Sequence, residues 1–424
     1  MNTLGQQTER KLQDMLLHAT RETEYYQTLF PATEAGAAVP ALSAFPLLFP
    51  QTVQREHSRF LCGRYQYYPD IEHLLLLRSF GYSGVPTEIY WDSRDESHSQ
   101  AFLWNYRQER FGVTPDEKCC AFRPAEYAGN KILDYMPARL SPDKNVLSFP
   151  MLDLSQERML AFADNILSFG PAWMILPASV ALQLAETMAA AKLSPPPSLR
   201  YMELYGEMPD AQTNAIIQDA FHVQTSTIYA TQAAGCVAAS CTHGHLHIFH
   251  KNAWVEVLKD GKPVTGREGD ICITSLQNTA MPLIRLKTGD RGILPDRPCP
   301  CGNPAPTLQL TRGHKCSFIK TPAGHKISPF ILKSLAEYTN EEISRCLSSI
   351  RFRQSGPDCM DVIMRVKPAF SGWKKEASRL FLRYIQNSAL RQMQWNFIFA
   401  DLHDTDNIET DNQPFFESWE GAEQ

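Results

Sequence analysis

The segment Leu286 to Gly302, LKTGDRGILPDRPCPCG, is the most informative stretch of this chain. Its first half predicts a strand followed by a tight turn, Thr288-Gly289-Asp290, which holds a carboxylate out toward a ligand. A carboxylate accepts two hydrogen bonds at once, so Asp290 suits a pair of vicinal hydroxyl groups. The alternative is a solvated acid that only caps the turn.

The second half of this segment carries a Cys-Pro-Cys knuckle, and a Cys/His run lies upstream of it. Zinc in structural sites is held by thiolates and imidazoles in a closed tetrahedron. The predicted ligands of a structural Zn²⁺ are Cys241, His247, Cys299 and Cys301, with His245 as the rival of His247. The alternative is a pair of free cysteines in a loop beside histidines on a strand.

The chain as a whole has the composition of a globular protein with more than one core. It has 424 residues, 43% of them hydrophobic, and a formal net charge of −5. Such a length favours a large domain and a smaller one, and the charge argues against a nucleic-acid partner. The charged N-terminus lacks the apolar core of a signal peptide, and no run is long enough for a bilayer. We expect a cytoplasmic protein with no membrane partner, whose eleven cysteines are mostly free thiols.

Alternating strand and helix patterns in the first half predict a mixed α/β core. Helices are expected over 8–30, 51–61, 99–111, 154–167, 178–192 and 210–220, with strands at 74–77, 89–91 and 201–204. Strands then dominate, at 246–249, 254–258, 270–274 and 281–286. The last part, with strands at 316–320, 350–353, 361–366 and 395–400 and helices at 330–338 and 372–386, predicts a small α+β domain. The predicted domains are residues 1–312 and 313–424, the second one mobile.

One further loop has a polar pattern that suits a phosphate ligand, and two more segments complete the set of motifs. The loop in Leu77 to Thr87, LRSFGYSGVPT, offers two serine hydroxyls and two glycines that permit close backbone approach. A plain β-hairpin explains this loop equally well. The other segments are Tyr205-Gly206-Glu207-Met208-Pro209 and Tyr229-Ala230-Thr231-Gln232.

The ordered set of these motifs resembles phenylacetate-CoA ligase and its relatives in the adenylate-forming superfamily. The resemblance implies an α/β fold with a large N-terminal adenylate-forming domain, a small C-terminal α+β domain and a hinge at 313–315. It also implies a two-step reaction: ATP and Mg²⁺ activate a carboxylic acid as an acyl-adenylate, and an acceptor then takes the acyl group.

The resemblance assigns roles to individual residues. Tyr229 stacks on adenine, Asp290 binds the ribose, and Thr231 and Gln232 act on phosphate and Mg²⁺, although Gln232 replaces the usual acid. The implied nucleotide-binding residues are Ser79, Gly81, Ser83, Gly84, Glu207, Tyr229, Thr231, Asp290 and Arg312. The implied catalytic residues are Thr231, Gln232 and Lys326.

The acid substrate is expected to be aromatic, with either a single ring or a fused heteroaromatic ring. Small residues after Tyr229 leave room for a flat ring between apolar walls. The expected lining residues are Trp173, Tyr205, Gly206, Ala230, Ala233, Ala234 and Gly235. The acceptor is left open between CoA, an amine and a carrier protein, and a homodimer is allowed for. A specialised pathway, such as secondary-metabolite or antibiotic biosynthesis, fits such a divergent sequence better than central degradation.

One departure from the family pattern bears on catalysis. The family carries a lysine near the C-terminus, but the matching region, residues 408–415, has none, and the last lysine of the chain is Lys375. Lys315 and Lys326 are candidates to replace it. Two rival functions follow: a non-catalytic protein that binds an aryl acid and nucleotide, and an acyltransferase that uses a preformed adenylate.

Overall fold

The structure is a computed structural model that describes residues 3–31, 39–67, 73–79, 84–124, 127–128, 131–132, 138–312, 316–386, 388–400 and 414–419. The chain divides into two compact units. Unit 1 comprises Met1–Tyr106 and Ile228–Gly313, and unit 2 comprises Arg107–Thr227 and His314–Gln424. Each unit is therefore built from two separate stretches of the sequence.

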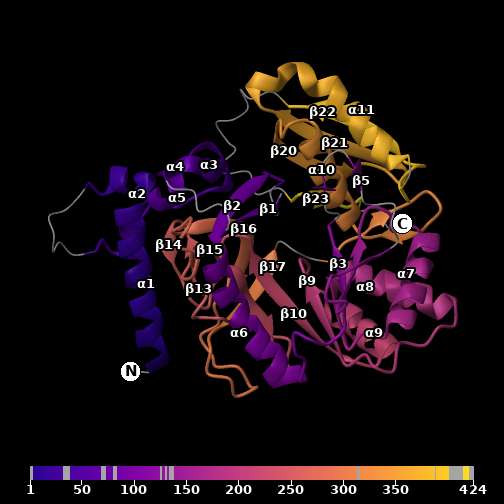
Figure 1. Cartoon of the computed structure of the whole chain (residues 1–424), viewed down its shortest axis with the longest axis horizontal. Helices are drawn as coiled ribbons and strands as arrows, with labels where there is room; N and C mark the ends of the chain where they lie inside the picture. The colour runs from indigo at the N-terminus through magenta and orange to yellow at the C-terminus, as the bar shows by residue number, and fades with distance from the viewer. Residues whose placement is uncertain are drawn as a thin grey trace. The chain divides into compact units, whose positions relative to one another are not determined.

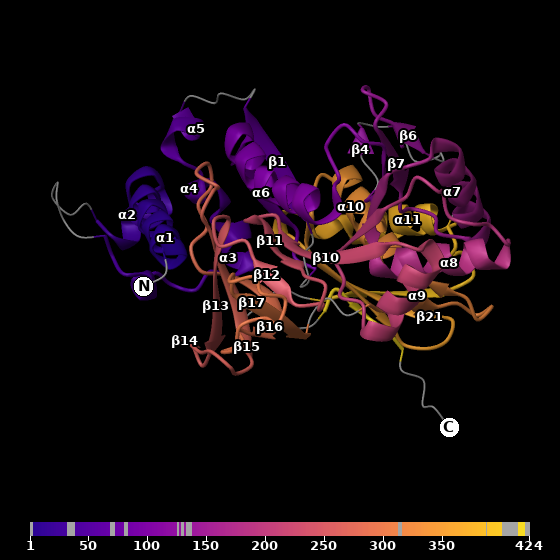
Figure 2. The same cartoon turned by 90° about the horizontal axis from the view of Figure 1, so that it is seen from below.

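Unit 1 combines N-terminal helices with antiparallel strands (Figure 1, Figure 2). The paired strands follow the order β14-β13-β15-β16-β17-β12-β11-β10, and β1 pairs separately with β2. The helices are α1 (Thr3–Glu22), α2 (Glu24–Leu29), η1 (Leu42–Ala44), α3 (Pro50–Arg55), α4 (His57–Phe60), α5 (Gly63–Tyr67) and α6 (Ser93–Phe111). The strands are β1 (Leu74–Ser79), β2 (Thr87–Asp92), β10 (Gln224–Thr231), β11 (Gly235–Ser240), β12 (Leu246–Ile248), β13 (Ala253–Lys259), β14 (Lys262–Pro263), β15 (Gly269–Ser275), β16 (Leu286–Ile293) and β17 (Thr307–Arg312). Helix α6 and strand β10 contain residues of both units.

The core of unit 1 forms between α1 and the segments that follow it. Leu12, Met15, Leu16 and Ala19 recur at the spacing of one helix face and are all buried. They belong to one buried cluster with aromatic side chains such as Phe45 and with residues of the 281–286 region. This packing fixes the segment that leads into β16.

Unit 2 contains a parallel sheet covered by helices (Figure 1). Strands β7, β3, β8 and β9 pair in parallel in that order, and β6 adds antiparallel to β7. The elements are β3 (Cys119–Arg123), β4 (Tyr127–Ala128), β5 (Lys131–Ile132), β6 (Arg139–Leu140), β7 (Val146–Pro150), α7 (Gln156–Phe169), β8 (Trp173–Pro177), α8 (Ala178–Ala190), β9 (Tyr201–Tyr205) and α9 (Ala211–Phe221). Strand residues such as Phe122 and Phe149 are fully buried, as expected where both faces of a parallel sheet are covered.

The C-terminal stretch of unit 2 forms a small α+β arrangement. Its four strands follow the order β22-β21-β20-β23, and α11 packs on them through Phe381, whose ring contacts Phe352 and Trp395. The elements are β18 (Ile319–Lys320), β19 (Lys326–Ile327), α10 (Phe330–Glu342), β20 (Leu347–Gln354), β21 (Cys359–Val366), η3 (Pro368–Trp373), α11 (Lys374–Ile385), β22 (Gln394–Phe399) and β23 (Phe416–Glu417). The predicted α/β fold with a C-terminal α+β part is confirmed. The boundary at 312/313 and the mobility of residues 313–424 stay predictions.

Two predicted features near Asp290 are wrong. The strand expected over 281–286 begins only at Leu286, because Pro282 cannot donate to a ladder and Arg285 has a left-handed φ of 57°. Thr288-Gly289-Asp290 is also not a turn at the end of a strand but a bulge inside β16. Asp270 pairs with Arg291 and Cys272 pairs with Lys287, so three residues of β16 face the single residue between them on β15. Gly289 takes a φ of 87° there, which few other residues tolerate.

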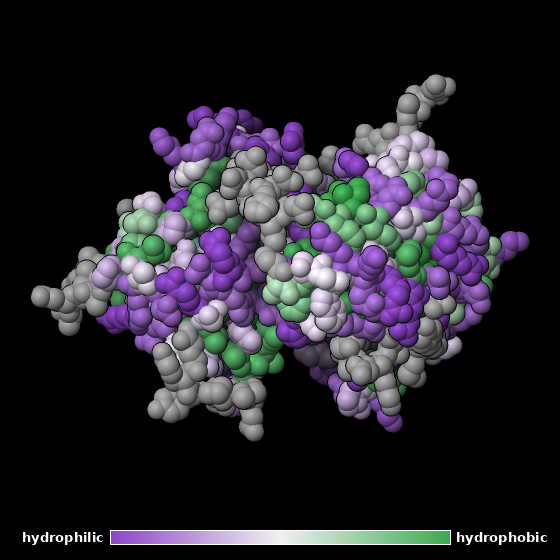
Figure 3. All heavy atoms as spheres, turned by 90° about the horizontal axis from the view of Figure 1, so that it is seen from above, coloured by the Kyte–Doolittle hydropathy of each residue, from purple (hydrophilic) through white to green (hydrophobic). Residues whose placement is uncertain are grey.

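Figure 3 shows the hydropathy of the described residues on one face of the molecule. Hydrophobic side chains gather there in separate patches between hydrophilic ones. Among the described residues, every helix is too short or too polar to cross a bilayer.

Candidate functional site

The Asp290 carboxylate and the Tyr229 hydroxyl meet in unit 1. Tyr229 Oη donates a hydrogen bond to Asp290 Oδ2 over 2.8 Å, and the two residues are 4% and 2% exposed. Burial raises the pKa of Tyr229 well above 10, and the nearby Asp290 charge raises it further. The bulge therefore turns the acid toward Tyr229, and the predicted contacts of both residues with a nucleotide stay predictions.

The hairpin after Tyr229 places the predicted catalytic residues at a turn. Thr231 pairs with Gly235, and its Oγ1 accepts a hydrogen bond from the Ala234 amide at 3.1 Å. Gln232 exposes its side chain while its carbonyl accepts a bond from Trp91 Nε1 at 2.8 Å. The tryptophan thus fixes the backbone of the turn and leaves the Gln232 amide accessible to a ligand.

The small residues of this hairpin do not all face the same way. Ala230 is exposed, whereas Ala233 and Ala234 are buried, and Ala233 belongs to the core cluster of unit 1. Gly235 has the Ser99 hydroxyl directly above it, 2.5 Å from where a Cβ would stand. No larger side chain fits at Gly235 without moving Ser99.

The remaining predicted nucleotide contacts of unit 1 lie at strand ends. Strands β1 and β2 pair antiparallel, with Ser79 opposite Thr87, and the phosphate role of the segment between them stays a prediction. Gly84 follows with a φ of 72°. Gly81, Ser83 and the Ser79 side chain lie outside the described residues. Arg312 is the exposed last residue of β17, and the predicted hinge at 313–315, with Lys315, is also outside the described part of the chain.

The other predicted site residues lie in unit 2. Tyr205 is the last residue of β9, and Gly206 and Glu207 follow it directly. Tyr205 Oη donates to the Phe122 carbonyl at 2.7 Å, and Glu207 Oε2 accepts from the Ser179 amide at 2.9 Å. Glu207 is thereby buried at the N-terminal end of α8, where its charge stabilises the helix. Lys326 is exposed on β19.

Trp173 belongs to a buried polar network that the sequence did not reveal. The Arg107 guanidinium lies 4.8 Å from the Trp173 ring centre and makes two hydrogen bonds to Glu203, of 2.5 and 2.7 Å. Tyr201 also donates to Glu203 at 3.2 Å. The one available signal was an acid inside the apolar strand segment YMELY. Trp173 is only 5% exposed and pairs with Tyr201 at the start of β8, whereas Tyr205 ends β9, so the structure does not bring these two predicted lining residues together.

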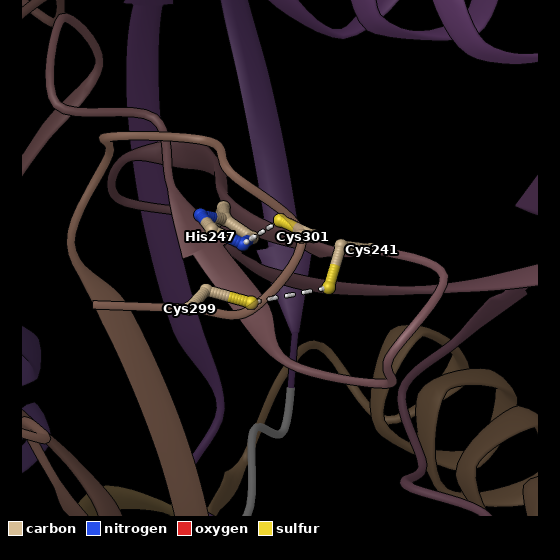
Figure 4. A group of neighbouring side chains, drawn as sticks. All are labelled: Cys241, His247, Cys299 and Cys301. Carbon is tan, nitrogen blue, oxygen red and sulfur yellow. Dashed lines mark hydrogen bonds between the residues drawn. The ribbon is translucent and has the colours of Figure 1, made fainter. Parts of the chain in front are cut away.

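The four predicted metal ligands come together in unit 1, at the ends of neighbouring strands (Figure 4). Cys241 follows β11, His247 lies on β12, and Cys299 and Cys301 lie in the loop between β16 and β17. Their ligand atoms all lie within 4.8 Å of one another. Strand pairing causes this, since β11 pairs with β12 and β12 with β17.

The donor set and its spacing fit a tetrahedral zinc ion. The Cys241 and Cys299 sulfurs are 3.7 Å apart, far beyond a disulfide bond. Two thiolates that each bind zinc at about 2.3 Å stand about 3.8 Å apart in a tetrahedron. The backbone amides of His243 and Asn303 donate to the sulfurs of Cys241 and Cys301, at 3.4 and 3.5 Å, and so hold both sulfurs in position.

The orientation of His247 also fits metal binding. Its Nδ1 lies 3.0 Å from the Ala305 carbonyl, to which only a protonated nitrogen can donate. Nε2 then keeps its lone pair, and it faces Cys301 Sγ at 3.2 Å. The rival His245 is exposed and places its Nδ1 3.2 Å from Cys299 Sγ, so it reaches the edge of the same cluster.

Comparisons with known proteins identify the fold. No protein-family model matches the chain, and a search of curated proteins finds no match. Among solved structures, 2-hydroxyisobutyryl-CoA ligase in complex with 2-HIB-AMP and CoA has a TM-score of 0.59 and 16% identity, covering 97% of this chain and 89% of the ligase. The same ligase in its postadenylation state, with R3-HIB-AMP, has a TM-score of 0.56 at 16% identity, covering 93% and 85%. The chain therefore has the fold of an adenylate-forming ligase.

Proposed function

We propose that this chain is an ATP-dependent adenylate-forming ligase that activates an aromatic carboxylic acid. The observation that carries the proposal is the fold, which is similar along nearly the whole chain to a ligase solved with an acyl-adenylate and CoA. The carboxylate oxygen would form a bond to the α-phosphorus of ATP, and the bond to pyrophosphate would break. The acyl group would then pass to CoA, an amine or a carrier protein.

Two sets of predicted residues would take part in this reaction. In unit 1, Tyr229, Asp290 and Arg312 would bind the nucleotide, and Thr231 and the accessible Gln232 amide would contact phosphate and Mg²⁺. In unit 2, Glu207 supports the Tyr205-Gly206 turn through α8, and Tyr205 would contribute an aromatic wall for the acid. Residues 313–424 would move between the two steps. A specialised biosynthetic pathway remains our expectation for the acid's source.

A structural Zn²⁺ forms part of this proposal. Cys241, His247, Cys299 and Cys301 would hold it, and their spacing and orientation support the assignment. When bound, the ion would supply a cross-link between the end of β11, β12 and the β16–β17 loop rather than chemistry on the substrate.

The assay that tests the proposed function is acid-dependent exchange of labelled pyrophosphate into ATP. Purified protein is incubated with Mg²⁺, ATP and a panel of single-ring and fused heteroaromatic acids. The expected result is exchange with at least one aryl acid and background exchange without acid. Exchange only with aliphatic acids would overturn the aromatic assignment.

A second candidate is a protein that binds an aryl acid and nucleotide without activating the acid. The observation that favours it is the lack of any lysine after Lys375, where the ligase family carries one. Binding of ATP and an aryl acid by calorimetry, together with no exchange across the panel, would select this candidate over the ligase.

A further inference from the structure

The carboxyl edge of the parallel sheet in unit 2 gathers charged and polar groups. Arg123 ends β3, Ser179 follows β8, and Tyr205 ends β9, with Gly206 and Glu207 after it. Because β3, β8 and β9 run in parallel, these groups lie at one edge. Ligands of open parallel sheets bind at this edge, outside the carboxyl ends of the strands.

Helix α10 is anchored at the same edge by its first turn. Ser328 Oγ lies 2.6 Å from Ser179 Oγ, and the Ser328 amide donates to Gln183 Oε1 at 3.3 Å. The Phe330 ring packs on Gly206, with Cζ 2.6 Å from where a Cβ on residue 206 would stand. The same ring meets Tyr205 edge to face, with 5.9 Å between the centroids. These contacts set the direction in which the following turn of α10 runs.

Lys333, one turn after Phe330, brings a cation to this place. Its Nζ lies 4.7 Å from the centroid of the Phe330 ring, the ring that contacts Gly206. An aromatic face holds an ammonium group in position without cancelling its charge. Phe330 thus links Lys333 to the predicted substrate turn, and the Lys333 Nζ also lies 5.9 Å from the centroid of the Phe415 ring.

Glu337, one turn further along α10, moderates this charge. Burial raises the pKa of Glu337 to about 7, while Lys333 lowers it and Glu341 raises it. A carboxyl with such a pKa is only partly ionised at neutral pH, so it offsets only part of the lysine charge. Arg123 adds a second positive charge near Tyr205.

We propose that Lys333 binds the α-phosphate of ATP and of the acyl-adenylate at this edge. The inference rests on the proposed function, and it gives that function the cation that the C-terminal sequence lacks. During adenylation the α-phosphorus gains a bond to the carboxylate oxygen and loses its bond to pyrophosphate. The lysine keeps its proton throughout and stabilises negative charge on the phosphate oxygens. Lys326, the earlier candidate, is exposed on β19, with its Nζ 5.9 Å from the Phe318 ring.

The experiment compares Lys333→Met and Lys333→Arg with two other lysines of unit 2. Lys320→Met is the matched control, because Lys320 also lies near an aromatic ring, 5.9 Å from that of Trp419, but on β18. Lys326→Met tests the rival. ATP affinity is measured by calorimetry, pyrophosphate exchange by the assay above, and folding by thermal melting.

The expected result is that Lys333→Met weakens ATP binding about tenfold and lowers exchange about 100-fold. Lys333→Arg should recover most of the ATP affinity, and Lys320→Met should match the wild type. If the wild type supports exchange and Lys333→Met changes neither ATP affinity nor the exchange rate, the inference is overturned and the proposed function stands. If the wild type binds ATP but supports no exchange, and Lys333→Met weakens that ATP binding, the inference stands and the ligase reaction is rejected. A wild type that binds no ATP overturns both. If Lys333→Met melts early, Lys333→Gln replaces it.

Discussion

Unit 1 contains two groups of polar side chains that the sequence singled out, and they are satisfied in different ways. Cys241, His247, Cys299 and Cys301 direct their ligand atoms at a common centre, within 4.8 Å of one another. Tyr229 and Asp290 instead bond directly to each other at 2.8 Å. The first group is joined by sulfur contacts, Cys241 Sγ to Cys299 Sγ at 3.7 Å and Cys301 Sγ to His247 Nε2 at 3.2 Å, whereas the second is joined by a hydrogen bond between oxygens.

The difference shows which sequence patterns predict a ligand reliably. Two cysteines that are two residues apart have few roles other than binding a metal, because a thiol is a weak hydrogen-bond donor and acceptor. A hydroxyl and a carboxylate have many uses, and burial of both makes a mutual hydrogen bond favourable. The cluster should therefore depend on a metal, and the pair should contribute to stability as well as to any nucleotide contact.

The largest effect is expected from removing the metal ligands. The wild type should contain about one zinc per chain by elemental analysis. Cys299→Ser combined with Cys301→Ser should lose that zinc and lower Tm by about 10 °C, because binding and folding are linked. Cys359→Ser, a thiol of unit 2 outside the cluster, serves as the control. If the wild type contains no metal and the double variant is as stable as the wild type, the Cys/His cluster does not depend on a metal, and the contrast with the Tyr229–Asp290 pair is lost.

The next effect tests whether the Tyr229–Asp290 pair also serves a ligand. Asp290→Ala leaves the buried Tyr229 hydroxyl without its acceptor and should cost about 1–3 kcal/mol of unfolding free energy. If Asp290 also binds the ribose, ATP affinity should fall about tenfold or more, and we expect this outcome by calorimetry. Asp290→Asn, which keeps an acceptor oxygen, should lose less stability. Unchanged ATP affinity in the alanine variant would make the pair purely structural.

A smaller effect concerns alkaline pH. The pKa of Tyr229 is raised well above 10, mainly by burial, so the folded state keeps a proton that the unfolded state releases. The stability from this difference is complete below about pH 10 and is lost as the pH rises beyond it. Tyr229→Phe should cost about 1 kcal/mol at pH 8 and should weaken the decline above pH 10.

Urea unfolding at pH 8 and pH 10.5 measures this change. Tyr90→Phe, a partly buried tyrosine on β2, is the control that should keep the wild-type decline. If the free energy of unfolding of Tyr229→Phe falls as steeply between pH 8 and pH 10.5 as that of the wild type, the phenol of Tyr229 ionises as easily in the folded protein as in the unfolded chain.

The smallest effect is expected at His245, the rival ligand. Because His245 is exposed and His247 is oriented by Ala305, His245→Ala should retain zinc and change stability by less than about 0.5 kcal/mol. His247→Ala should lose the metal. Zinc loss in His245→Ala with retention in His247→Ala would exchange their roles.

Most of the fold follows from local patterns, as the C-terminal stretch shows. The helix expected at 330–338 and the strands at 350–353 and 361–366 all form, because their periodicity matches one buried face. The strand expected at 281–286 does not form. The apolar run indicates that these residues are buried, but it does not determine their backbone conformation. Met281, Leu283 and Ile284 are indeed buried, but in a connection that ends in the left-handed Arg285.

The site was less predictable because its side chains are satisfied by distant partners. Glu207 accepts from an amide 28 residues earlier, and Arg107 pairs with an acid 96 residues away. A pattern within a short window of sequence cannot indicate partners that are this far apart along the chain. The Cys/His cluster was the exception. Cys241 and His247 lie close together in the sequence, as do Cys299 and Cys301, so only the approach of these two pairs to each other had to be inferred.

The discontinuous make-up of unit 2 has a consequence for how the protein is made. Gly206 and Ser179 are covered by Phe330 and Ser328, which leave the ribosome more than a hundred residues later. Residues 107–227 therefore spend a substantial part of synthesis with this surface uncovered, while the second stretch of unit 1 is still emerging. This surface of unit 2 can therefore be covered only after Ser328 and Phe330 have been synthesised, and until then it is exposed to contacts with other chains.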